Sequence, residues 1–136
     1  MHPNEEFLGV DVGAARVGVA RGSGGARIAE PLATYSADEA MEKIKETALS
    51  NAACGIVVGL PRNLDGNETE QTKAVRDWAE KAKQQIKLPF YWQDEALTSH
   101  IAEDNRAKDP GGSDALAAAV LLQDFLDSRA EERVRC

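Results

Sequence analysis

A single carboxylate inside an apolar strand constrains the fold of this chain more than any other feature. The pattern Phe-Leu-Gly-Val-Asp-Val predicts a buried strand over residues 7–12, with Asp11 in its second half. Gly13 then turns the chain, and residues 16–21 are predicted to return as an antiparallel partner strand. A buried carboxylate is costly unless it is paired or holds a cation. Alternatively, the Asp11 side chain bonds the backbone N–H groups of the turn near Gly13.

The composition predicts one globular domain. The 136 residues are 43% hydrophobic and 29% charged, which suits a single domain with its own core. We expect this domain to span 1–136, with an ordered core over about 6–128 and a charged tail over 129–136. No apolar run approaches the roughly 20 residues needed to span a bilayer, and the short acidic N-terminus does not resemble a signal peptide. A cytoplasmic protein without a membrane partner is therefore expected, as a monomer or a weak homodimer.

The charge balance limits the kinds of nucleic-acid binding that this chain can support. Lys and Arg number 16 against 23 Asp and Glu, which gives a net charge of −7. A general nucleic-acid binder usually carries a basic excess or a basic stripe. A nuclease remains compatible with this charge, because a metal site gathers carboxylates and a local basic patch can lie on an acidic protein.

The remaining pattern predicts strands and helices in the order β-β-β-α-β-α-β-α. A third strand over about 26–35 completes an antiparallel meander, and Pro31 places part of that strand at an edge or a bulge. The elements predicted after it are a helix from Ser36 to about 50, a strand over 55–59, a helix from about 67 to 85, a strand over 90–93, a short helix over 98–104 and a helix from Ser113 to about 129.

This order predicts an α/β fold. A meander followed by β-α-β units gives a mixed five-stranded sheet with helices on both faces. Capping boxes are predicted where the first two helices begin, at Ser36–Glu39 and Asn67–Glu70. Ligands of such sheets collect at the carboxyl ends of the parallel strands.

Three acidic residues are candidates for a shared site at that end of the sheet. Asp11 lies on the first strand, Glu95 directly follows the fifth, and Asp114 lies in the first turn of the last helix. Three carboxylates that meet cannot all stay ionised without a cation, and oxygen ligands suit Mg²⁺ or Mn²⁺. The alternatives are that Glu95 is an ordinary exposed residue and that Asp114 only favours the positive end of its helix.

Four short motifs, in this order, resemble the YqgF/RuvX family of RNase H-like nucleases. They extend over nearly the whole chain, from about residue 7 to 127. They are Val10–Gly13 with Arg16–Ala20, Ile56–Pro61 with Asp65-Gly66, Asp94-Glu95 with Leu97-Thr98, and Ser113–Ala118 with Leu121–Gln123.

The resemblance implies an RNase H-like fold and a metal-dependent endonuclease that hydrolyses phosphodiester bonds. The implied role is maturation of the 5′ end of pre-16S rRNA, with structured RNA as substrate, and some members of the family are described as resolving Holliday junctions in branched DNA. Carried over to this sequence, the catalytic and metal-binding carboxylates are Asp11, Glu95 and Asp114. One or two Mg²⁺ or Mn²⁺ ions are the implied cofactor.

Phosphate contacts are predicted at three residues near this site, namely Arg16, Arg62 and Asn63. The alternative is that they are ordinary surface residues. The chain departs from the family pattern where Ala96 replaces a usual Arg and where 105–112 is short and weakly basic.

Two other functions compete with the nuclease. A non-catalytic protein that binds RNA or ribosomes on the same fold is favoured by the missing basic residues and opposed by the retained carboxylates. A sugar-kinase or actin-like ATPase is suggested by the D-x-G-x-x-x-x-G pattern of residues 11–18. That ATPase fold needs two such domains, which 136 residues cannot supply.

Overall fold

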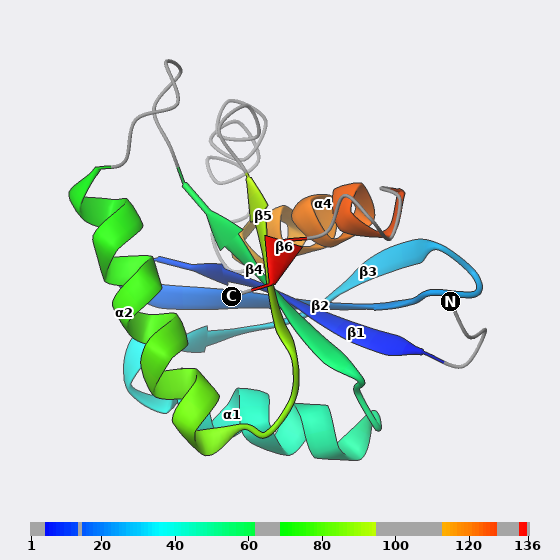
Figure 1. Ribbon diagram of the computed structural model, residues 1–136, viewed down its shortest axis with the longest axis horizontal. Coiled ribbons are helices and arrows are strands. Elements are labelled where there is room, and N and C mark those ends of the chain that lie inside the picture. The colour runs from blue at the N-terminus through cyan, green and yellow to red at the C-terminus, as the bar shows by residue number, and fades with distance from the viewer. Residues whose placement is uncertain (1–4, 14, 62–68, 95–112, 128–133, 136) are drawn as a thin grey trace.

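A six-stranded mixed sheet forms the centre of the protein (Figure 1). The computed structural model describes residues 5–13, 15–61, 69–94, 113–127 and 134–135. Its elements are β1 (Glu6–Val12), β2 (Arg16–Ser23), β3 (Ile28–Ser36), α1 (Ala37–Ser50), β4 (Gly55–Leu60), α2 (Glu70–Gln85), β5 (Phe90–Asp94), α4 (Ser113–Asp127) and β6 (Val134–Arg135). The predicted helix over 98–104 lies outside the described residues.

The strand order confirms the predicted α/β sheet and adds one strand to it. The order is β3-β2-β1-β4-β5-β6, with the first three strands antiparallel and β1, β4 and β5 parallel. The prediction of five strands is wrong by one, because Val134 and Arg135 pair antiparallel with Trp92 and Tyr91 of β5. These two residues were expected in a charged tail, since a pair is too short to show the alternation of a strand.

Helices cover both faces of the sheet, as predicted. α1 and α2 lie on one face and α4 on the other (Figure 1). Alternate residues of β1 therefore enter two different cores. Val10 and Val12 pack in the core under α1 and α2, and Phe7 packs in the core under α4. β4 is buried at every position because helices cover both of its faces.

Pro31 marks an edge and a bulge, as predicted. β3 is the outer strand of the sheet. Its register with β2 shifts between Val19 and Ala20, which leaves Leu32 as an extra residue beside Pro31. A proline without an N–H group is tolerated at such a place because no ladder hydrogen bond is lost there.

The predicted capping boxes are not formed. Ser36 is the N-cap of α1, but its side chain makes no capping hydrogen bond. α2 begins two residues later than the predicted box, with Thr69 as its N-cap and Thr72 as the reciprocal partner. The usual partner three residues after the N-cap is Glu or Gln, and here the Thr72 hydroxyl takes that role.

Two glycines fix the height and direction of α4 above the sheet. A Cβ atom on Gly9 would lie 2.7 Å from Cβ of Leu122 and 2.9 Å from the carbonyl oxygen of Ala118. A Cβ atom on Gly22, beside the N-terminal end of β1, would lie 2.8 Å from Cδ1 of Leu126. α4 thus runs antiparallel to β1, and its first turn points toward the carboxyl end of that strand.

We predict that Gly9→Ala lowers the free energy of unfolding by about 2–3 kcal/mol, because the new methyl group meets helix backbone that cannot move alone. Gly22→Ala is the matched control. Its closest contact is the far end of the flexible Leu126 side chain, and the nearest backbone atom, the Ile28 carbonyl oxygen, lies farther away at 3.1 Å. It should therefore cost less than Gly9→Ala, about 1–2 kcal/mol. Urea unfolding followed by circular dichroism measures both losses, and an equal loss would contradict the assigned contact.

Candidate active site at the carboxyl ends of the parallel strands

Asp11 lies on the α4 face of the sheet. Its neighbours Val10 and Val12 enter the core under α1 and α2, and side chains alternate along a strand. Asp11 therefore shares the opposite face with Gly9, over which α4 packs. It pairs with Gly18 of β2 and is half-buried. A carboxylate at this depth needs polar or cationic partners, and Asp11 does take part in a polar interaction.

The parallel strands end beside Asp11. Val10 pairs with Val58 of β4, and the last residue of β4, Leu60, pairs with Asp94 of β5. The carboxyl ends of β1, β4 and β5 thus lie at one edge of the sheet, where α/β folds bind ligands. Glu95 is the next residue in the sequence after β5, and it lies outside the described residues.

The backbone of α4 begins at this same edge. Ala118 lies over Gly9, and the helix extends from there through one further turn to Ser113, toward the carboxyl end of β1. Asp114 belongs to that first turn, but its side chain is outside the described part of the structure. The fold therefore brings the start of α4 to the edge of the sheet that carries Asp11.

Of the predicted metal ligands, only Asp11 has a described side chain. Within the described ranges, no group of three or more His, Cys, Asp or Glu side chains is close enough to hold a metal ion. The cluster with Glu95 and Asp114 thus stays a prediction. The three predicted ligands would offer only carboxylate oxygens, which fits hard cations such as Mg²⁺ or Mn²⁺ and not a thiolate-binding or imidazole-binding metal.

Of the predicted phosphate contacts, Arg16 is the one that the structure describes. It is exposed at the start of β2, and its carbonyl oxygen accepts a 2.9 Å hydrogen bond from the Gly13 N–H group. This bond closes the turn that follows Asp11. Arg62 and Asn63 lie outside the described residues, directly after Pro61 in the sequence.

Thr72 is a positioning residue that the sequence did not reveal. It is the one polar side chain in the described part of the chain that is fully buried. Its hydroxyl donates a 2.5 Å hydrogen bond to the Pro61 carbonyl and accepts a 2.9 Å bond from the Thr69 N–H group. The start of α2 is thereby tied to the end of β4, from which the chain enters the segment with Arg62 and Asn63. Two threonines three residues apart were the available signal.

Comparison with known proteins gives the family and the fold. The model of the RuvX family, described as Holliday junction resolvase, matches residues 5–128. Relatives from Rickettsia typhi and Rickettsia africae, both named "Putative pre-16S rRNA nuclease", are each 36% identical over 93% of this chain, and the match covers 87% and 88% of their own lengths.

Two solved structures share the architecture. T. thermophilus RuvC in complex with Holliday junction substrate has a TM-score of 0.61 at 13% identity, covering 97% of this chain and 99% of that one. A second Thermus thermophilus RuvC structure has a TM-score of 0.58 at 14% identity, covering 96% and 99%. The predicted RNase H-like fold is confirmed. Among the described helices, none is long and apolar enough to cross a membrane.

We predict that Thr72→Val destabilises the protein by about 2 kcal/mol, because the Pro61 carbonyl and the Thr69 N–H group lose their buried partner. The matched control is Thr47→Val. Thr47 is half-buried, and its hydroxyl donates its hydrogen bond to the Lys43 carbonyl of its own helix, so this change should stay within about 0.5 kcal/mol. Denaturant unfolding measures both variants, and equal costs would refute the role of the Thr72 bonds.

Proposed function

The chain belongs to the RuvX family, and from that premise we propose that it is a metal-dependent endonuclease for the 5′ end of pre-16S rRNA. The observation that carries this proposal is the place of Asp11, half-buried where the parallel strands end and α4 begins. A half-buried carboxylate at the carboxyl ends of parallel strands lies where such sheets bind ligands. The names of the Rickettsia relatives support pre-16S rRNA as the substrate.

Asp11, Glu95 and Asp114 are the proposed catalytic carboxylates and ligands of one or two Mg²⁺ or Mn²⁺ ions. Two patterns support this set. Tyr91 of β5 packs in the core on the α4 side, and by strand alternation position 95 would share that side. By ideal helical spacing, position 114 would share a face with Ala118, which contacts Gly9.

The protein's own contribution is to hold charge in place. Asp11 is fixed by a strand that is hydrogen-bonded on both sides, so its carboxylate needs little reorganisation to serve as a ligand. Divalent cations, when bound, supply Lewis-acid stabilisation of the charge that develops on phosphate oxygens. Arg16, together with Arg62 and Asn63 after Pro61, is proposed to orient the substrate backbone.

A second candidate function is cleavage of branched DNA. It is favoured by the description of the matching family model and by the likeness to RuvC in complex with Holliday junction substrate. The short, weakly basic 105–112 segment instead supports a narrow substrate range or a non-catalytic binding protein. We propose a single domain that acts in the cytoplasm as a monomer or a weak homodimer.

We predict that Asp11→Asn lowers cleavage of a pre-16S 5′ leader in Mn²⁺ by more than about 100-fold, because a ligating oxygen loses its charge. Asp77→Asn is the matched control, since Asp77 is an exposed carboxylate on α2. It should cleave like the unchanged protein. Single-turnover assays on the leader and on a four-way DNA junction measure both variants and rank the two substrates.

Three outcomes would count against this proposal. Equal cleavage by the unchanged protein and Asp11→Asn would assign the activity to a contaminant. Faster cleavage of the junction than of the leader would favour the DNA substrate. Tight leader binding without cleavage in either Mn²⁺ or Mg²⁺ would favour the non-catalytic binding protein.

A further inference from the structure

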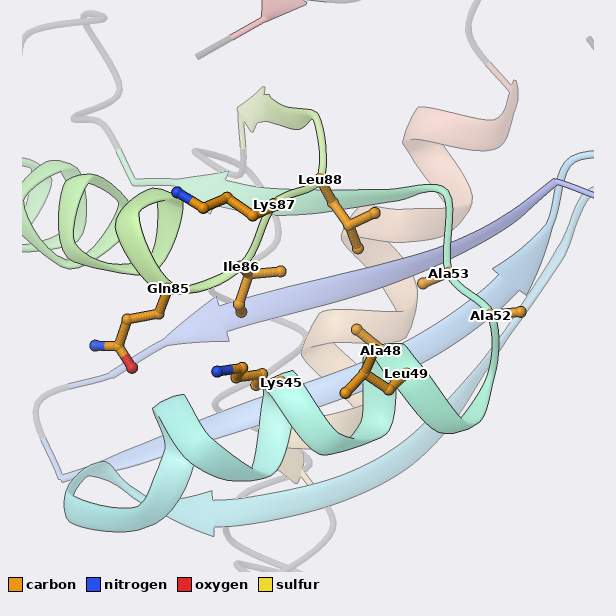
Figure 2. A pocket seen from close by; sticks show the side chains of 9 residues that line it. All are labelled: Lys45, Ala48, Leu49, Ala52, Ala53, Gln85, Ile86, Lys87 and Leu88. Carbon is orange, nitrogen blue, oxygen red and sulfur yellow. The ribbon is translucent and has the colours of Figure 1, made fainter.

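An open cavity of about 430 Å³ lies at the opposite edge of the sheet from Asp11. Its walls come from the end of α1, the connection into β4, and the connection from α2 to β5 (Figure 2). We call it the helix-end groove. It is lined by Lys45, Ala48, Leu49, Ala52, Ala53, Gln85, Ile86, Lys87 and Leu88.

The floor of the helix-end groove is apolar and continuous with the core. Ala48, Ala53 and Ile86 are buried members of the cluster under α1 and α2. Leu49 stands at the rim and is 76% exposed, the highest exposure among the large apolar side chains that the structure describes. The exposed Leu49 and the open apolar cavity beside it form one continuous apolar surface, which is the kind of surface that protein interfaces cover.

The groove also carries positive charge on a protein that is acidic as a whole. Lys45 and Lys87 lie on facing walls, and Figure 2 shows their amino groups at the same end of the cavity as the Gln85 amide. Neither lysine forms an ion pair with any residue in the described ranges. Against a net charge of −7, this pair of cations is complementary to carboxylates on an incoming partner.

We propose that the helix-end groove binds an acidic amphipathic segment of a partner protein. Leucine-like side chains of the segment fill the cavity beside Leu49, and its Asp or Glu side chains reach Lys45 and Lys87. A nucleic acid fits this surface less well, because phosphates would meet two lysines while leaving the apolar floor uncovered. The inference does not depend on the proposed nuclease activity.

The location lets a partner and a substrate bind together. Ala53 and Leu88 lie just before the N-terminal ends of β4 and β5, whereas Asp11 lies toward the carboxyl end of the parallel strands. Those ends are separated by the length of β4, or roughly 20 Å. A partner in the groove therefore does not cover the proposed site, and it could tether the enzyme near its substrate.

The experiment titrates isotope-labelled full-length protein with a helical peptide that has Leu at positions i, i+3, i+4 and i+7 and Glu between them. Backbone amide shifts should concentrate at the groove. Leu49→Asp and Leu49→Ala should each raise the dissociation constant of the peptide by about tenfold or more. Ile28→Asp is the matched control, since Ile28 is 67% exposed on β3, and it should change the constant by less than about twofold.

Charge is tested by exchanging the two lysines. Lys45→Glu combined with Lys87→Glu should weaken binding by about tenfold and reverse the preference between the Glu peptide and a matching Lys peptide. Lys43→Glu with Lys81→Glu, on the exposed sides of α1 and α2, is the control pair and should keep the preference.

Several results would overturn the inference. They are an absence of shifts up to about 1 mM peptide, equal binding of the Lys peptide, and binding that Leu49→Asp leaves intact. The same shifts caused by a single-stranded RNA would assign the groove to nucleic acid. Equal binding of octanoate would assign it to a small amphiphile. Dispersed spectra of every variant establish that the fold is retained.

Discussion

The close approach of α4 to β1 is the contact on which the geometry of the proposed site depends. Because Gly9 has no side chain, the backbone of Ala118 and the Cβ atom of Leu122 lie directly on the strand. Farther along the helix, the centroid of the Phe125 ring lies 5.3 Å from that of Phe7 and 5.2 Å from that of Tyr91. α4 is thus held along its length, and its first turn is carried to the edge where Asp11 lies.

This arrangement explains how a carboxylate can be held in the sheet without breaking it. β1 contributes Val10 and Val12 to one core and Phe7 to the other, so its pairing with β2 and β4 is fixed by apolar burial. Asp11 occupies the last position on the α4 face, where the cover of the helix ends and the side chain is only half-buried. β1 holds the Asp11 backbone rigidly, and its place at the edge of the sheet leaves the carboxylate accessible to a ligand.

The local sequence pattern was enough to predict most of the sheet. The features that it did not predict depend on contacts between segments that are distant in the sequence. The meander, the two parallel strands and the covering of both faces follow from alternation, turn residues and chain order. Asp11 was identified because a lone charge interrupts an apolar run. Thr72 and the pairing of Val134–Arg135 could not be found in this way, since the first needs the Pro61 carbonyl and the second needs β5 as a neighbour. The helix-end groove needs three segments that meet only in the folded chain.

The two edges of the sheet differ in charge and in how apolar they are, and this difference suits substrate binding at one edge and partner binding at the other. At the edge with Asp11 one predicted ligand is described, and the predicted basic contacts are few, so substrate affinity from phosphate contacts alone should be low. The other edge offers an apolar floor with two cations that form no ion pair in the described part of the chain. A partner held there would raise the local concentration of substrate at the first edge without adding a contact to it. A nuclease with a net charge of −7 could then act on a polyanion with few predicted basic contacts at its site.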